Sequence, residues 1–122
     1  MFISNIEYLN NDNGEAEVSI SDGQYTVVCY AFPFSNLPAN PHIDYIDAFM
    51  CTCIEKSDTQ QYLIQKLPQH FAYRLAALVL DKERQIVSIG KIVIHLDFPI
   101  PKDIDNGEYV VFSVSRLDFI SA

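Results

Sequence analysis

EAEVSISDGQYTVVCYAFPF, residues 15–34, alternates apolar and polar side chains on both sides of Asp22-Gly23. A period of two is typical of half-buried strands. Asp-Gly is a frequent two-residue hairpin loop because it accepts positive φ angles. Counting outward from that loop predicts the cross-strand pairs Ser21–Gln24, Ile20–Tyr25, Val18–Val27 and Ala16–Cys29.

The predicted hairpin has one apolar face and one acidic face. Ala16, Val18 and Ile20 fall on the first face, whereas Glu15 and Glu17 fall on the second. A slip of one residue would bury both carboxylates, so the alternation strongly favours this arrangement of faces. We therefore expect a mainly β protein.

Other segments also have strand character. Alternation or β-branched content predicts strands over residues 3–9, 45–55, 85–89, 92–97 and 109–120. Residues 45–55 are apolar in both phases, which is typical of a strand buried on both faces. In residues 109–120 the apolar phase flips near Ser115-Arg116, as a β-bulge would produce.

Two segments leave alternatives open. Residues 71–82 fit a helix by propensity and spacing, but their β neighbours lead us to favour a strand. Residues 59–72 allow one short helix, and Pro68 is expected to end a helix or a strand in this segment. The expected fold is a single β-rich domain over residues 1–122: a small, bent antiparallel barrel or sandwich, OB-like in one form, with at most one short helix.

Charge is distributed unevenly along the chain. The net charge is −8, and residues 1–55 hold eight Asp or Glu and no Lys or Arg, whereas the remainder holds eight of each sign. A negative field repels phosphate backbones and anionic membranes and attracts basic proteins. Residues 1–5 lack the basic and apolar regions of a signal peptide, so we expect a cytoplasmic protein with reduced cysteines.

No residue pattern predicts catalysis, a metal site or a cofactor. Cys51 and Cys53 are spaced more closely than thiolates in zinc sites usually are, so we interpret both as core residues. His95 and Asp97 share one strand face, where an ordinary solvated surface is the simpler interpretation. Asp103–Glu108 lacks the bidentate Glu of a calcium loop and is predicted to be a turn. We therefore expect a protein that is not an enzyme.

A resemblance to other proteins spans most of the chain. It rests on the 15–25 hairpin and on three C-terminal stretches, Val87–Gly90, Leu96–Pro101 and Phe112–Asp118. The sequence resembles a group of small, uncharacterised bacterial β-rich proteins. In size, acidity and want of catalytic motifs it is also similar to immunity proteins of bacterial toxin systems. That similarity implies an inhibitor that occludes its toxin.

We accordingly predict a protein–protein interaction module of the immunity type, which covers a basic toxin surface. The predicted partner-binding residues are Asp12, Glu15, Glu17, Asp44 and Asp47. The alternative is a β-barrel module that binds a ligand or nucleic acid, for which aromatic residues at 25, 30, 32 and 34 would supply a stacking platform. The sequence does not specify the oligomeric state.

Overall fold

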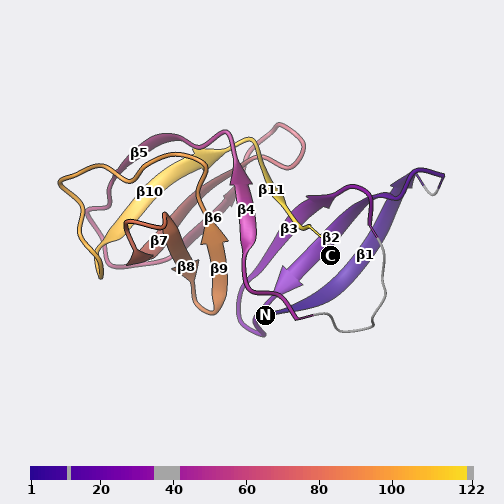
Figure 1. Cartoon of the computed structure of the whole chain (residues 1–122), viewed down its shortest axis with the longest axis horizontal. Coiled ribbons are helices and arrows are strands. Elements are labelled where there is room, and N and C mark those ends of the chain that lie inside the picture. The colour runs from indigo at the N-terminus through magenta and orange to yellow at the C-terminus, as the bar shows by residue number, and fades with distance from the viewer. Residues whose placement is uncertain (11, 35–41, 121–122) are drawn as a thin grey trace.

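The computed structural model describes residues 1–10, 12–34 and 42–120 and is mainly β, with 54% strand and no helix in the described part. Figure 1 shows one extended, twisted sheet. In chain order its strands are β1 (Phe2–Asn10), β2 (Glu15–Ser21), β3 (Thr26–Ala31), β4 (Ile46–Phe49), β5 (Thr52–Lys56), β6 (Leu63–Lys66), β7 (Tyr73–Asp81), β8 (Ile86–Ile89), β9 (Ile92–His95), β10 (Tyr109–Val114) and β11 (Arg116–Asp118).

The mainly β prediction is confirmed, but in place of the expected antiparallel barrel or sandwich the described strands form one mixed sheet that is not closed into a barrel. The strand order is β1-β2-β3-β11-β4-β9-β8-β7-β10-β5, with β6 added on β7. Closure would require β1 to pair with β5, and these strands lie at opposite ends of the molecule (Figure 1). The sheet is mixed because β3–β11 and β4–β9 are parallel. Residues 59–72 contain β6 and turns where a short helix was allowed.

The predicted hairpin forms with its faces as expected, but its register differs by two residues. Val18 pairs with Cys29 and Ile20 with Val27, and the two-residue loop is Gly23-Gln24. Gly23, at φ +96°, occupies the first loop position, as in type II′ turns. A shift of two residues leaves each side chain on its predicted face, because the side-chain period is two.

The Asp22 carboxylate explains the shift. Its Oδ1 accepts hydrogen bonds from the N–H groups of Gln24 (2.9 Å) and Tyr25 (2.7 Å), so Asp22 precedes the turn instead of entering it. Its Oδ2 accepts a third bond, from Lys91 N–H (2.8 Å), in the β8–β9 turn. Desolvation would raise the pKa of Asp22, but these three bonds outweigh it and lower the pKa. Asp22 thus joins two hairpin tips.

The phase flip near Ser115 marks a change of strand partners. β10 lies between β7 and β5, whereas β11 lies between β4 and β3. Ser115 N–H donates to the Phe49 carbonyl (3.0 Å) at this crossover. The buried side chains Val114 and Leu117 flank it in opposite phases, so both strands still face the core. The predicted bulge is therefore the point at which the chain passes between two parts of the sheet.

Two other sequence predictions meet different outcomes. Residues 73–81 form strand β7, which confirms the strand over the helix. The single doubly buried strand predicted over residues 45–55 is wrong. The chain breaks after Phe49 and takes positive φ at Met50 and Cys53. β4 packs on the core, but β5 is mostly exposed because it forms an end of the sheet.

One hydrophobic cluster underlies both parts of the sheet. Val18, Ile20 and Val27 of the hairpin are fully buried in it with Leu75 of β7 and Phe112 of β10. Fully burying such a side chain stabilises a fold by roughly 1.5–3 kcal/mol relative to exposure. The hairpin therefore depends on the rest of the sheet for its apolar face.

Replacement of Gly90 by Ala is expected to destabilise the protein more than replacement of Gly107 by Ala. Both glycines have positive φ, at +57° and +87°, so both variants carry the same kind of backbone strain. A Cβ at Gly90 would overlap Asp22 Oδ2 and lie 2.8 Å from Tyr25 Cδ2, whereas a Cβ at Gly107 meets nothing within 4 Å. The difference in the free energy of unfolding, measured with urea, should be about 1–3 kcal/mol. Equal losses would show that the two tips separate readily.

Candidate functional site

The register of six neighbouring strands places four carboxylates in one line across the sheet. Each residue in this line is the direct cross-strand partner of the next. Tyr30 interrupts the carboxylates, and the bridge from Tyr30 to Asp118 is the single β3–β11 pairing. We call the carboxylates the acidic row: Glu7 (β1), Glu17 (β2), Asp118 (β11) and Asp47 (β4), with His95 (β9) at its end.

The acidic row lies on the face opposite the core. Residues next to its members, such as Val18, Leu117 and Ala48, are buried in the core, and successive side chains of a strand point to opposite faces. The side chains of Glu17, Asp118 and Asp47 are 25%, 21% and 32% exposed. Neighbouring strands are about 4.8 Å apart, so these three carboxylates span about 14 Å. They form a partly desolvated acidic line.

Like charges directly opposite each other destabilise a sheet. Three members of the acidic row are offset by a cation or an imidazole. Arg116 Nε donates to Asp118 Oδ1 (2.7 Å), His95 Nδ1 lies 3.0 Å from Asp47 Oδ1, and His70 Nε2 contacts Glu17 Oε1. Among the described residues, no ion pair reaches Glu7. One Arg and two His thus face four carboxylates, which leaves the row net negative near neutral pH.

Aromatic rings hold the centre of the acidic row. The Arg116 guanidinium lies between the rings of Tyr30 (4.9 Å) and Phe49 (4.4 Å), where cation–π attraction fixes it beside Asp118. The Tyr30 hydroxyl donates to Glu15 Oε2 (2.8 Å). Desolvation, and then Glu15, raise the pKa of Tyr30, so this hydroxyl keeps its proton at neutral pH.

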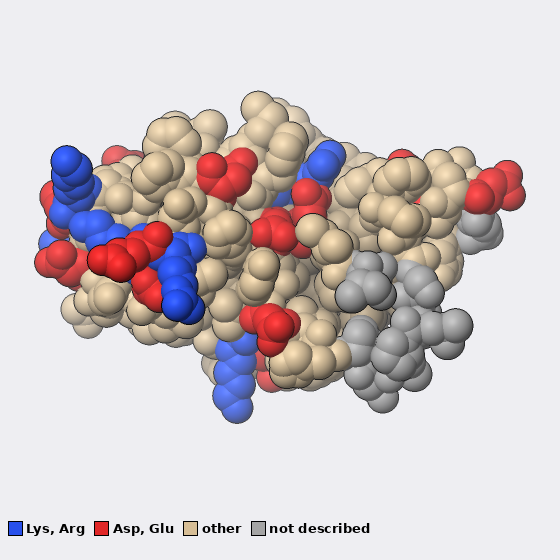
Figure 2. All heavy atoms as spheres, viewed as in Figure 1, with Lys and Arg blue, Asp and Glu red and all other residues tan. Residues whose placement is uncertain are grey.

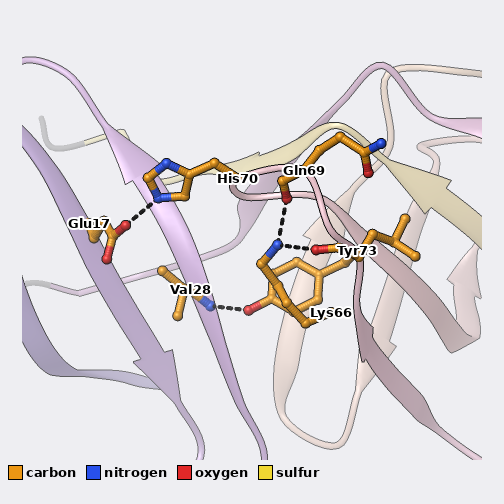
Figure 3. A network of polar contacts seen from close by, with 7 residues as sticks. Glu17, Val28, Lys66, Gln69, His70 and Tyr73 are labelled. Carbon is orange, nitrogen blue, oxygen red and sulfur yellow. Dashed lines mark hydrogen bonds and ion pairs between the residues drawn. The ribbon is translucent and has the colours of Figure 1, made fainter.

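A loop between β6 and β7 places His70 over Glu17, as Figure 3 shows. The Lys66 ammonium donates to the carbonyls of Leu67 (2.7 Å) and Gln69 (2.6 Å), which fixes the loop's turn. His70 then stacks on Phe71, with ring centroids 4.0 Å apart and planes within 9°. Through this loop the C-terminal half contacts the acidic face of β2.

The predicted site residues do not all come together. Glu17 and Asp47 belong to the acidic row, and Glu15 lies two residues from Glu17 on the same face. Asp12 lies in the β1–β2 turn, where its N–H donates to Asn10 Oδ1 (3.0 Å). Asp44 precedes β4 and pairs with His42 (2.7 Å), with both side chains well exposed.

Sequence reasoning missed Glu7 and Asp118 as members of the acidic row. The alternation of β1 could have placed Glu7 on the acidic face. Asp118 lies in a three-residue strand whose neighbours β3 and β4 are distant in sequence, so no local signal placed it there.

Exposed apolar side chains border the acidic row. Tyr45, Phe49 and Met50 flank Asp47 along the chain and are 49%, 40% and 55% exposed. The Asp97 carboxylate accepts the N–H groups of Met50 (2.7 Å) and Cys51 (3.0 Å), which stabilises the positive φ at Met50. Figure 2 shows several Asp and Glu side chains near the middle of the molecule in this view, and most of the visible Lys and Arg towards the end away from β1–β3.

Other candidate chemistry finds little support within the described ranges. No cluster of three His, Cys, Asp or Glu suited to a metal ion occurs there. No helix in those ranges is long and apolar enough to cross a membrane. The core interpretation holds for Cys51 but is wrong for Cys53, which is exposed because β5 is an edge strand.

No known family, curated protein or solved structure matches the chain.

The Asp97→Asn variant is expected to be less stable than wild type at neutral pH and equally stable in acid. Desolvation would raise the pKa of Asp97, but the bonds from Cys51 and Met50 outweigh it and lower the pKa. A lowered pKa stabilises the fold above the unfolded value of about 3.9, and the gain disappears as pH falls through the folded value. Urea unfolding across this pH range is the measurement, with the exposed Glu83→Gln as control. A deficit that persists at low pH would contradict the proposed cause.

Thiol titration is expected to separate the three cysteines. Burial raises the pKa of Cys51 to about 12 and raises that of Cys29 further, whereas Cys53 is exposed. The thiolate is the reactive form, so a disulfide reagent should modify one thiol quickly in folded protein and all three after denaturation. Replacement of Cys53 by Ser should remove the fast phase. If the fast phase remains in that variant, Cys29 or Cys51 must become accessible through local opening of β5 or of the backbone around Met50.

Proposed function

We propose that this protein is a non-enzymatic protein–protein interaction module that covers a basic surface of its partner. The concrete form is an immunity-type inhibitor in the cytoplasm, which occludes a basic toxin. The acidic row is the observation that carries the proposal. It combines carboxylates from four strands at the cost of like-charge repulsion, and folding alone gives no reason to retain such a cost.

The partial burial of the row favours a charged partner. Coulomb attraction is stronger and less screened by salt where carboxylates are partly desolvated than where they are fully hydrated. Lys or Arg side chains of a partner would neutralise the repulsion among Glu7, Glu17 and Asp118. Binding would thus relieve an unfavourable term already present in the free protein.

The apolar border supplies a different contribution. Charge complementarity acts mainly on association rate and specificity, whereas buried aromatic and apolar anchors supply most of the affinity. Tyr45, Phe49 and Met50 are exposed next to Asp47, so a partner that covers this end of the acidic row would bury apolar anchors beside charged residues.

The alternative module is less well supported. Three of the aromatic residues suggested for a stacking platform have separate surroundings and do not form one surface. Phe34 is buried against Phe119, Tyr25 packs on Tyr62, and Tyr30 lies among carboxylates. Phosphate groups would meet a negative field at Tyr30. The strands of the described ranges also form an open sheet, which lacks the mouth of a barrel in which a ligand would bind.

Charge reversal of the acidic row is expected to slow partner association. The partner to test is the product of the gene adjacent to the one that encodes this chain. The double variant Glu17→Lys/Asp47→Lys should lower the association rate by about tenfold or more, because steering depends on local field. The control Glu83→Lys/Asp103→Lys makes the same change in net charge at exposed positions outside the row. Stopped-flow mixing at low and at physiological salt measures both.

Three outcomes would contradict the proposal. One is an equal association rate for the two double variants, whether both are slowed or both are unchanged. The second is an adjacent gene product that is neither basic nor bound by this protein. The third is an adjacent gene product that is toxic to a bacterial host and is not suppressed by co-expression of this protein. Urea unfolding of each variant controls for loss of fold.

A further inference from the structure

Three strands have an unpaired side among the described residues, and they differ in how that side is protected. β5 has five residues, a positive φ at Cys53 and Lys56 at its end. β6 has four residues and ends in Lys66. Short length, irregular backbone and lysine are usual protections of a sheet edge. β1 has nine residues, pairs only with β2 in the described chain, and contains no Pro, Lys or Arg.

The backbone directions of β1 follow from its neighbours. Val28 N–H donates to the Tyr73 hydroxyl (2.9 Å), and the Tyr30 carbonyl accepts from Phe119 N–H (2.8 Å). The backbone N–H and C=O groups of Val28 and Tyr30 are therefore directed away from β2. In an antiparallel pair, the backbone groups of the residue opposite such a residue are also directed away from the shared side. Glu17, opposite Tyr30, therefore bonds toward β1 and its partner Glu7.

Hydrogen-bonding direction alternates along a strand. Since Glu7 bonds toward β2, its neighbours Ile6 and Tyr8 direct their N–H and C=O groups outward. Register is continuous from Asn5 to Tyr8, and its irregularities fall at Ile3/Asn5 and Tyr8/Asn10. From Asn5 to Tyr8 the outward side of β1 thus presents a regular template that no other described strand pairs with.

The side chains on this edge specify the chemistry of an added strand. Glu7 is exposed and ends the acidic row, so a residue paired with Glu7 would lie on the acidic face and extend the row beyond Glu7, on the side away from Glu17. Residues paired with Ile6 and Tyr8 would lie on the apolar face. An extended segment that alternates basic and apolar residues matches both faces.

We propose that β1 binds an extended, basic strand of the partner and so lengthens the sheet. This inference rests on the proposed function and names the part of the partner that is recognised. Main-chain hydrogen bonds supply affinity in such strand addition, and alternate side chains supply specificity. A second copy of this chain fits less well, because it would extend the acidic row with more carboxylates and carries a net charge of −8 itself.

A Lys-Val octapeptide of alternating sequence is the probe, and the same peptide with Glu for Lys is its control. We expect the Lys-Val peptide to slow hydrogen exchange of the Ile6 and Tyr8 amides in the full chain, as followed by NMR. Tyr8→Pro removes an outward N–H, which edge strands tolerate. It should weaken peptide binding by about tenfold relative to Tyr8→Ala, which loses the same ring and keeps the N–H.

Protection at Ile6 and Tyr8 together with the Pro–Ala difference supports the proposal. Protection elsewhere, equal affinities for the two Tyr8 variants, or no binding of the Lys-Val peptide would overturn it. A dimer that Tyr8→Pro abolishes would also overturn it, because the occupant would then be a second copy. The proposed function fails by a separate result: unchanged association of the Glu17→Lys/Asp47→Lys variant with the adjacent gene product.

Discussion

Strand β11 is the constraint on which the rest of the structure depends. Its three residues lie between β3 and β4, and through them the N-terminal hairpin joins the rest of the sheet. The join is narrow: one bridge at Tyr30 and Asp118, and the bond from Phe119 N–H to the Tyr30 carbonyl. Contacts from outside the strand reinforce it, since Tyr73 caps the free Val28 N–H and Asp22 holds the β8–β9 turn.

The same strand determines the electrostatics. Without Asp118 and Arg116 between β3 and β4, Glu17 and Asp47 would belong to separate surfaces. With them, repulsion among carboxylates is offset locally by one guanidinium and two imidazoles, each positioned by an aromatic neighbour: Arg116 by Tyr30 and Phe49, His70 by Phe71, and His95 by Tyr45. The strand order thus brings the carboxylates together, and their mutual repulsion is reduced but not removed.

The sequence predicts what depends on a period of two and misses what depends on distant partners. It gives the faces of Glu15, Glu17 and Val18 correctly, since parity survives even the two-residue register shift caused by Asp22. It reveals the phase flip at Ser115 but not the change of strand partners there, because nothing near residue 118 indicates that β11 will lie between β3 and β4. Cys53 was misplaced for the same reason: apolar character cannot show that a strand lies at an edge.

The position of β11 also constrains the order of events during synthesis. Tyr30 and Asp118 are 88 residues apart, so β3 leaves the ribosome long before the strand that will pair with it. Until then one side of the nascent hairpin is an open edge beside a half-covered apolar face. Such long-range pairing is slow to form and prone to misassembly. The carboxylates of Glu15 and Glu17 on this hairpin therefore also repel other unfinished chains until residues 116–119 have been synthesised.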